Sequence, residues 1–342
     1  MARIWRRLRP RGVCAYVVCM GGLCSLCTLI VILRCSCDGQ SSLLAQSLAS
    51  HNNALLSPLS PVAVQLPSTY LVVLIMTRPT DASLRRTIRK TWLKLSSKGP
   101  EIVRHYFPIG TKNMNADVLL TLKQEQETFG DDLLLMDTVE EGYGNLAPKT
   151  LASFVAAHRR LAFKFALKVD DDSFVRLGAL LKSLKDIEHP RLYWGFLDGR
   201  ARPRRKGKWR EQEWMLCDRY LPYQLGGGYL LAWALVDYLA RNADLLKMYR
   251  SEDVAVGAWL AGLDIRYVHD PRFDTEYMSR GCSNQYLITH KQEESTMLAM
   301  FENLKASGNL CASEFRTRGS YVYDWSAPPS QCCIRSNDSR IP

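Results

Sequence analysis

The sequence lacks an internal repeat and, in its long C-terminal part, any cysteine spacing typical of a zinc site. The five cysteines beyond residue 200 include no C-x-x-C pair and no Cys/His array, so structural zinc is not expected there. With 47% hydrophobic residues over 342 positions, the chain is neither largely disordered nor a small scaffold stapled by disulfides. Its length accommodates one large domain or two smaller ones with a buried core.

Acidic residues are absent from the first 34 positions, where basic ones gather. The formal net charge is +11, and more than half of that excess comes from six arginines around one apolar stretch: Arg3, Arg6, Arg7, Arg9, Arg11 and Arg34. Residues 12–33 between them carry no charge and, as a helix, would reach ~33 Å, enough to cross a bilayer. A cleaved signal peptide is the alternative, but its apolar region is typically only ~7–15 residues long. We therefore predict a transmembrane anchor.

The arginines also predict the topology. More positive charge precedes the span than follows it, so residues 1–11 are expected to be a cytoplasmic tail, with the bulk of the chain luminal or extracellular. Residues 34–67, rich in serine and proline, are expected to be a stem, and residues 68–342 a luminal domain. There, nucleic acid is not an expected ligand, and Asn337 begins one glycosylation acceptor. The disulfide candidates, whose pairing the sequence leaves open, are Cys217, Cys282, Cys311, Cys332 and Cys333.

Short apolar segments alternate with helical patterns from Tyr70 onward. Strands are predicted over residues 70–76, 103–109, 133–136 and 165–169, and helices over residues 82–95, 116–128 and 146–162. This alternation predicts an α/β domain with a mostly parallel central sheet. Ligands of such sheets bind beyond the carboxyl ends of the strands, so the residues that follow Met76, Met136 and Val169 are candidates for a site.

Three adjacent carboxylates, Asp170, Asp171 and Asp172, follow the last predicted strand. Adjacent carboxylates repel one another and resist desolvation, so a cation between them would offset the cost. Because side chains alternate along an extended segment, Asp170 and Asp172 should point one way and Asp171 the other. This pattern predicts a Mg²⁺ or Mn²⁺ site that grips a pyrophosphate. The alternatives are a solvated acidic turn or a cap for a helix over residues 173–184.

Four further features are open to two interpretations each. Glu252 and Asp253 precede an apolar helical segment and could cap it or supply a general base. The glycine run at residues 226–228 permits close backbone approach to a ligand, or only a turn. His290, taken alone, is more often a structural residue than a ligand. The seven basic residues within 200–210 form either a solvated loop or a clamp for an anionic glycan or nucleotide phosphates.

Several motifs then agree in order and spacing with one family. They are Arg85-x-x-Ile88-Arg89-x-Thr91-Trp92, Tyr143-x-Asn145-Leu146-x-x-Lys149-Thr150, Lys168-x-Asp170-Asp171-Asp172, Trp194-Gly195, Gly226-Gly227-Gly228-Tyr229 and Glu252-Asp253-Val254. Together they resemble the β-1,3-glycosyltransferases of glycosyltransferase family 31, over about residues 68–342. Within that family, the segments LYWGFLDGR, HDPRFDTEY and YVYDWSAPPSQCC are similar to galactosyltransferases that add the second galactose of the proteoglycan linkage tetrasaccharide.

The resemblance implies a GT-A fold, UDP-galactose as donor, Mn²⁺ or another divalent cation, and a single-pass type II protein of the Golgi membrane. It implies Asp253 as the catalytic base, and Asp170, Asp172 and His290 as metal ligands. The substrate-binding residues it implies are Arg85, Arg89, Lys149, Asp171, Trp194, Gly227, Gly228 and Glu252. The implied acceptor is the galactosyl-β-1,4-xylosyl primer of proteoglycan core proteins, and other transferases of that linkage region are candidate partners.

The resemblance, together with these residues, predicts an inverting galactosyltransferase. Asp253 would remove the proton of the acceptor 3-hydroxyl, and the cation would offset the charge on the departing UDP. Two other interpretations stay open: a β-1,3-transferase for another UDP-sugar or acceptor, and a Golgi subunit that binds glycans without turnover. A pure binding module has no need of two intact carboxylate clusters, which favours the enzyme.

Overall fold

A computed structural model describes residues 66–95, 99–207 and 209–342. The predicted tail (residues 1–11), the predicted membrane span (12–33) and all but the last two residues of the predicted stem (34–67) lie outside this part. Among the described residues, no helix is both long and apolar enough to cross a membrane. Residues Leu66–Pro342 form one compact unit.

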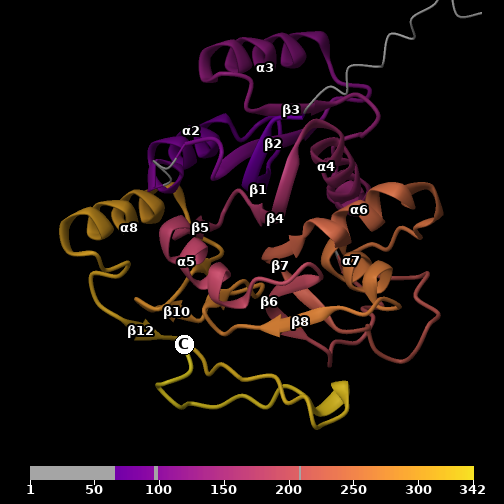
Figure 1. The fold of residues 1–342 in the computed structure, drawn as a ribbon, viewed down its shortest axis with the longest axis vertical. Coiled ribbons are helices and arrows are strands. Elements are labelled where there is room, and N and C mark those ends of the chain that lie inside the picture. The colour runs from indigo at the N-terminus through magenta and orange to yellow at the C-terminus, as the bar shows by residue number, and fades with distance from the viewer. Residues whose placement is uncertain (1–65, 96–98, 208) are drawn as a thin grey trace, which may run out of the picture. The chain divides into compact units, whose positions relative to one another are not determined.

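A seven-stranded sheet runs through this unit in the order β3-β2-β1-β4-β7-β6-β8 (Figure 1). Its strands are β1 (Ser68–Met76), β2 (Val103–Gly110), β3 (Leu133–Met136), β4 (Ala162–Asp170), β6 (Leu192–Asp198), β7 (Tyr223–Ala232) and β8 (Arg266–His269). Only β7 runs against its neighbours, β4 and β6, and the other neighbouring pairs are parallel. The prediction of an α/β fold with a mostly parallel sheet is confirmed.

The two central strands, β1 and β4, are buried because their apolar runs can be covered on both faces. Every side chain from Leu71 to Met76 is at most 4% exposed. The parallel pairing of β1 with β4 ends where Met76 lies opposite Asp170. The acidic run therefore emerges at the carboxyl edge of the sheet, as expected for a ligand site in such a fold.

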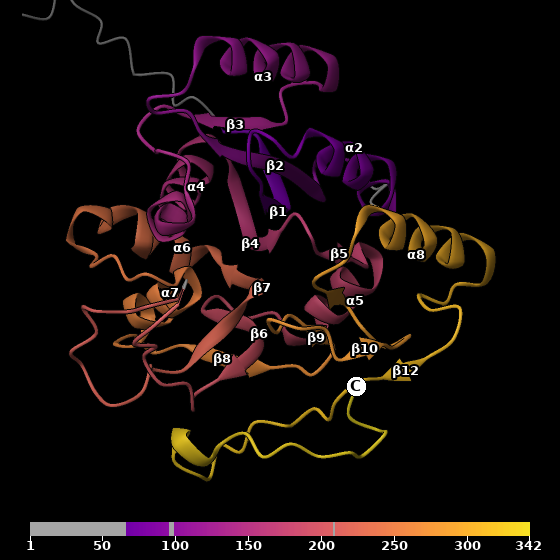
Figure 2. The same cartoon turned by 180° about the vertical axis from the view of Figure 1, so that it is seen from behind.

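Helices cover both faces of the sheet (Figures 1 and 2). One core contains buried residues of α4 (Leu146–Arg160), α6 (Trp233–Arg241) and α7 (Glu252–Leu260), and the other contains those of α2 (Ala82–Lys90), α3 (Ala116–Phe129), α5 (Leu177–Ile187) and α8 (Glu294–Ser307). The alternating side chains of β1 divide between them: Val72 and Leu74 join the first core, and Val73 and Ile75 the second. Side chains of β1 therefore pack into both cores.

Two predicted helices are shorter in the structure. The helix expected over residues 82–95 ends at Lys90, and Trp92–Leu95 form a 3₁₀ turn, η1. At the break, the hydroxyl of Thr91 donates to the carbonyl oxygen of Thr87, a local bond that competes with helix continuation. The helix expected to reach residue 162 ends at Arg160, because residue 162 already pairs with β1 as the first residue of β4.

A small three-stranded sheet, β5-β11-β9, lies at the end of β4. Its strands are β5 (Phe174–Val175), β9 (Phe273–Asp274) and β11 (Ile288–Thr289). The helix considered over residues 173–184 therefore begins only at Leu177, so the acidic run leads into a strand instead of capping a helix. The backbone amide of Gln292, just beyond β11, donates to the carbonyl oxygen of Asp172 at 2.8 Å. This contact brings the C-terminal part of the chain to the acidic run.

Beyond α8 the chain forms β12 (Phe315–Arg316), which pairs with β10 (Gly281–Cys282), and an irregular segment up to the C-terminus. Disulfides join Cys282 to Cys311 and Cys332 to Cys333. Cys217 is exposed and has no disulfide among the described cysteines. The structure thus gives the pairing that the sequence left open: four of the five candidates form two disulfides, and Cys217 is the unpaired fifth.

His269, the last residue of β8, makes the stability of the fold depend on pH. Its Nδ1 accepts from the amide of Leu197 at 3.0 Å, and its Nε2 donates to the carbonyl oxygen of Tyr321 at 2.9 Å. Burial lowers its pKa from 6.5 to about 4. Below pH 6.5 the unfolded chain binds a proton that the folded imidazole does not. We therefore expect this residue to reduce the free energy of unfolding by about 2 kcal/mol between pH 7 and pH 5.

Urea denaturation of the full-length protein at both pH values measures this effect, with His269→Gln as the matched variant. Glutamine does not titrate, so the variant should lose about 2 kcal/mol less stability than the wild type over that interval. The same pH dependence in both proteins would contradict the role given to His269.

Candidate active site

The three adjacent carboxylates lie at the carboxyl end of β4. Asp170 and Asp172 both face His290, whereas Asp171 turns to the other side and bonds to the hydroxyl of Thr77. The alternation expected from the extended backbone is confirmed. Two carboxylates and one imidazole therefore lie close together, and the third carboxylate lies on the opposite side of the chain.

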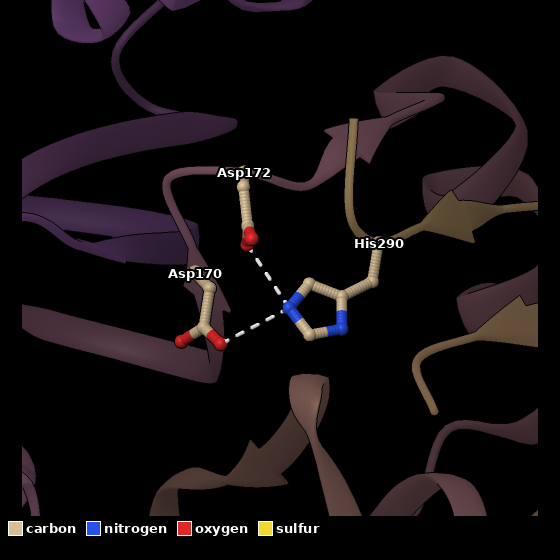
Figure 3. A group of neighbouring side chains, drawn as sticks. All are labelled: Asp170, Asp172 and His290. Atoms are coloured by element: carbon tan, nitrogen blue, oxygen red, sulfur yellow. Dashed lines mark ion pairs between the residues drawn. The ribbon is translucent and has the colours of Figure 1, made fainter. Parts of the chain in front are cut away.

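The cluster of Asp170, Asp172 and His290 is compact (Figure 3). Nε2 of His290 lies 3.3 Å from an oxygen of Asp170 and 3.0 Å from one of Asp172. On the other side of the ring, Nδ1 donates to the backbone oxygen of Glu276 at 3.0 Å. Gly227 lies so close that a Cβ there would come within 2.6 Å of the ring. The glycine run lies within β7 and not in a turn, and the close approach to a ligand predicted for it stays a prediction.

This donor set fits a divalent cation. A backbone oxygen only accepts, so Nδ1 carries a hydrogen and Nε2 is the ring nitrogen that faces the two carboxylates, where a metal ion would take the place of the second ring proton. Nε2 is buried and makes no hydrogen bond of acceptable geometry with either of them. Carboxylate and imidazole ligands suit Mn²⁺, and a hydrogen bond from the distal ring nitrogen is usual for metal-bound histidine. Asp170, Asp172 and His290 are therefore the residues that would hold the metal.

The carboxylates of the cluster are surrounded by positive charge. Burial alone would lower the pKa of His290, but the ion pairs with Asp170 and Asp172 outweigh it and raise that pKa to about 9, so the ring is protonated when no metal is bound. Lys291 lies 2.7 Å from the second oxygen of Asp172, and Lys168 lies 2.7 Å from the second oxygen of Asp170. Although burial opposes it, these contacts lower the pKa of both carboxyls. Both therefore stay ionised, as metal ligands must be.

Lys168 connects this cluster to the second acidic pair, and sequence reasoning gave it no role. Its ammonium, 3% exposed, donates to Asp170 at 2.7 Å, to the backbone oxygen of Gly226 at 2.6 Å and to Glu252 at 3.2 Å. Burial disfavours the charge, but the two carboxylates raise the pKa of Lys168 well above its usual range. Lys168 lies two residues before Asp170, so the alternation that grouped the aspartates could have found it.

Asp253, beside Glu252 at the start of α7, is tied to β7. Its two carboxylate oxygens accept from the amides of Gly226, at 3.1 Å, and Val254, at 2.9 Å. Burial raises the pKa of Asp253, and it raises that of Glu252, which is bonded to Tyr229, to about 7. The bond to Gly226 is not one that a simple helix cap makes. A carboxylate with a raised pKa is a better proton acceptor, which suits a general base.

A cavity of about 410 Å³ joins the metal cluster to Asp253. Its lining includes Asp170, Gly227 and His290 together with Lys168, Glu252 and Asp253. Cavities of ~300–1,000 Å³ are typical of small-molecule sites. A candidate metal site and a candidate base thus open onto the same space.

Lys149 and Asp171 meet on the other side of the end of β4. Lys149 donates to the backbone oxygen of Thr77 at 2.5 Å and to Glu141 at 2.6 Å. One oxygen of Asp171 is buried without a hydrogen-bond partner among the described residues, and burial raises the pKa of Asp171 to about 7. Such an unsatisfied oxygen suits a ligand that donates a hydrogen bond. Their predicted contact with the nucleotide stays a prediction.

Arg85 and Arg89 are engaged with protein groups. Both form ion pairs with Glu125, and Arg89 also pairs with Asp132 at 2.7 Å. Arg85 is fully buried and donates to backbone oxygens of the loop that follows β1, at Arg78 and Pro79. These contacts fix that loop. Neither arginine lines the cavity described above, and their predicted contact with the nucleotide also stays a prediction.

The remaining predicted residues are more scattered. Trp194 is fully buried, donates its indole N–H to Asp270 at 3.0 Å and packs against Phe273, so it belongs to the core. Gly228 lies against Ile288, where a Cβ would come within 3.1 Å. Asn337 is exposed, so its side chain is accessible to the modification predicted for it. A sequence motif does not distinguish such core positions from ligand contacts.

The predicted basic loop contributes part of the cavity wall. Arg200, Arg202 and Arg204 line it, whereas Arg205 and Lys206 are exposed and do not. Sequence reasoning gave no role to the aromatic residues Tyr143, Trp209 and Tyr277 or to Thr275, which also line the cavity, because single residues in irregular segments carry no periodic signal. The loop is thus neither wholly solvated nor wholly a clamp.

Replacing Lys168 by methionine is expected to lower the free energy of unfolding by about 3 kcal/mol. The change leaves the buried Glu252 and the partly exposed Asp170 without the cation between them. Adding Glu252→Gln removes one of the two charges and should restore part of the loss. Urea denaturation measures both effects, and equal midpoints for Lys168→Met and wild type would contradict the bridging role of Lys168.

Comparison with known proteins identifies the family of this chain. Residues 83–271 match the family model described as Galactosyltransferase. The chain therefore belongs to the galactosyltransferase family. Within that family, the mouse protein named β-1,3-galactosyltransferase 6 is 44% identical to it over 339 residues, which cover 97% of each chain.

More distant relatives share a smaller part. The hydroxyproline O-galactosyltransferase GALT5 of Arabidopsis thaliana is 33% identical over 239 residues, which cover 65% of this chain and 33% of the plant protein. The chain thus matches about a third of that relative's length. Among solved structures, the mannosyltransferase PcManGT from Pyrobaculum calidifontis, in complex with GDP-Man and Mn²⁺, is 12% identical and covers 60% of this chain and 57% of its own, with a TM-score of 0.37. A TM-score this low carries no argument about the fold.

Proposed function

We propose that this protein transfers galactose from UDP-galactose, in β-1,3 linkage and with inversion, to the galactosyl-β-1,4-xylosyl primer of proteoglycan core proteins. The observation that carries the proposal is the single cavity onto which the metal cluster and Asp253 both open. Membership of the galactosyltransferase family and 44% identity to mouse β-1,3-galactosyltransferase 6 support the sugar and the linkage. The acceptor rests on the resemblance of segments such as residues 192–200 and 269–277.

Asp253 acts on the acceptor. Its carboxylate takes the proton of the acceptor 3-hydroxyl while that oxygen forms a bond to C1 of galactose. The bond between C1 and UDP breaks, and its electron pair leaves on the UDP oxygen. Attack from the face opposite UDP turns the α linkage of the donor into a β linkage. The raised pKa of Asp253, caused by burial, makes it a stronger base for this step.

Asp170, Asp172 and His290 would hold Mn²⁺ or another divalent cation, which when bound neutralises charge on the diphosphate. Lys168 keeps Asp170 in place and, through Gly226, holds the strand whose amide bonds to Asp253. Asp171 and Lys149, beyond the other side of β4, are the proposed contacts of the nucleoside. In this arrangement the diphosphate lies on one side of the end of β4 and the nucleoside on the other.

The cellular setting is proposed from the sequence. The arginine-flanked residues 12–33 support a single-pass type II anchor in the Golgi membrane, with a GT-A catalytic domain in the lumen. Two disulfides and an accessible Asn337 are compatible with an oxidising, glycosylating compartment. Other transferases of the linkage region are the proposed associates.

A panel of donors and acceptors tests the function. Full-length protein is incubated with Mn²⁺, each of three UDP-sugars (galactose, N-acetylglucosamine, N-acetylgalactosamine) and each of three acceptors. The acceptors are methyl glycosides of galactosyl-β-1,4-xylose, xylose and N-acetylglucosamine. We expect transfer from UDP-galactose to the first acceptor. Faster transfer with another donor or acceptor would replace that assignment, and no turnover with any pair would favour the non-catalytic glycan-binding subunit.

A further inference from the structure

One wall of the cavity is formed by aromatic side chains that neither the metal cluster nor Asp253 requires. Tyr143 of the 3₁₀ turn η2 (Tyr143–Asn145), Trp209 and Tyr277 all line it. Tyr143 is 44% exposed and Tyr277 is 58% exposed. Large apolar rings gathered at a cavity with such exposure mark a surface that a ligand covers.

Trp209 is fixed at the centre of this aromatic wall. It lies in a loop whose ends meet in an isolated parallel bridge between Arg204 and Arg210, and the guanidinium of Arg204 is 5.7 Å from its ring centroid. Its indole N–H donates to the hydroxyl of Tyr143, and its ring meets that of Tyr277 at 6.5 Å and 73°. The three aromatic residues come from distant segments, so the fold itself assembles and orients the wall.

Thr275 adds an unsatisfied hydroxyl to the same wall. It lines the cavity and is only 2% exposed, and its Oγ1 has no hydrogen-bond partner among the described residues. A buried hydroxyl without a partner costs free energy. Thr275 directly precedes Glu276, whose backbone oxygen orients His290, and lies two residues before Tyr277. A ligand hydroxyl placed between the metal cluster and the aromatic wall would satisfy it.

The aromatic wall also adjoins the candidate base. The ring centroid of Tyr143 lies 6.0 Å from the guanidinium of Arg250, three residues before Asp253, and all three residues line the cavity. Tyr220 lines the cavity as well, and its ring packs edge-on against that of Tyr223, another lining residue, at 6.2 Å. The sugar whose hydroxyl gives its proton to Asp253 is the acceptor. It must therefore lie on the Asp253 side of the cavity, next to these rings.

We propose that Trp209, Tyr143 and Tyr277 form the subsite for the terminal galactose of the acceptor, with Thr275 bonded to one of its ring hydroxyls. A hexopyranose matches this wall because it has an apolar C–H face for an indole ring and hydroxyls around its edge. The inference deepens the proposed function and rests on it, since the identity of the acceptor comes from there.

Three variants test the subsite: Trp209→Ala, Tyr277→Ala and Thr275→Val. Trp325→Ala is the matched control, because Trp325 is 59% exposed and does not line the cavity. In the full-length protein, each is measured for the KM of methyl galactosyl-β-1,4-xyloside, the KM of UDP-galactose, and the slow hydrolysis of UDP-galactose without acceptor. We expect about a tenfold or larger rise in acceptor KM for Trp209→Ala. Smaller rises are expected for the other two, with donor KM and hydrolysis unchanged.

An acceptor KM that stays within twofold of the wild type in all three variants would overturn the subsite, as would an equal rise for Trp325→Ala. A parallel rise in donor KM would assign the wall to UDP-galactose and would also overturn it. Tyr277 and Thr275 keep the test decisive if Trp209→Ala fails to fold, since one is exposed and the other changes by a single isosteric group. If the wild type itself transfers nothing to this acceptor, the proposed function fails, and the subsite inference falls with it for that separate reason.

Discussion

Asp253→Asn is expected to lower kcat for galactosyl transfer by about 10²–10⁴-fold while the affinity for UDP with Mn²⁺ stays close to that of the wild type. Asparagine keeps the shape of the side chain and can still accept from the amide of Gly226, but it cannot take the proton of the acceptor hydroxyl. The loss should therefore appear in the chemical step. Transfer rates and UDP binding are measured on the same preparation.

Asp264→Asn is the control for this variant, since the Asp264 side chain is 84% exposed and pairs only with Arg191 among the described residues. It should transfer galactose at the wild-type rate. Near-wild-type transfer by Asp253→Asn would remove Asp253 from the role of base. A lost affinity for UDP in that variant would instead make Asp253 a donor-binding residue.

Asp172→Ala is expected to abolish the dependence of UDP affinity on Mn²⁺, with a loss of about 100-fold or more at saturating metal. The change removes one of three converging ligands and leaves Asp170 and His290, which cannot complete the site alone. Lys291, the other partner of Asp172, is 47% exposed and returns to water, so the fold should tolerate the change. Calorimetric titration with UDP, with and without Mn²⁺, measures the effect.

The same titration of Asp264→Asn should reproduce the wild-type curves. Unchanged Mn²⁺-dependent affinity in Asp172→Ala would refute Asp172 as a ligand. If Asp172→Ala binds UDP more weakly than the wild type even when Mn²⁺ is absent from both, Asp172 would act on the nucleotide directly instead of through the metal.

The parts of the fold that the sequence predicted best are those with strong local patterns. The apolar runs of β1 and β4 are buried on both faces, and the acidic run at the end of β4 alternates as an extended chain requires. The part of the candidate site that depends on local pattern could also be predicted: its place at the carboxyl end of a strand and the two carboxylates that point the same way. These features are set by residues that are adjacent in the sequence, so a local sequence pattern is enough to predict them.

The rest depends on contacts between distant residues. His290 lies beside the aspartates because β11 pairs with β5. Each of these strands has only two residues, too few to produce a periodic pattern in the sequence. The break after Lys90 and the early start of β4 arise because local side-chain bonds and strand pairing outweigh helical pattern. Trp194 was expected to contact a substrate, but it lies in the core. A Trp-Gly pair in the sequence does not show whether the tryptophan is a core residue or a ligand contact.

The most direct test of the central claim is the proton NMR spectrum of the product formed by full-length protein from UDP-galactose, Mn²⁺ and methyl galactosyl-β-1,4-xyloside. We predict a new anomeric doublet with the large coupling of a β-galactoside from the first turnovers, and substitution at C3 of the acceptor galactose. The Asp253→Asn variant should form no such signal on the same timescale. An α-anomeric product, or attachment at another carbon, would contradict inverting β-1,3 transfer with Asp253 as the base.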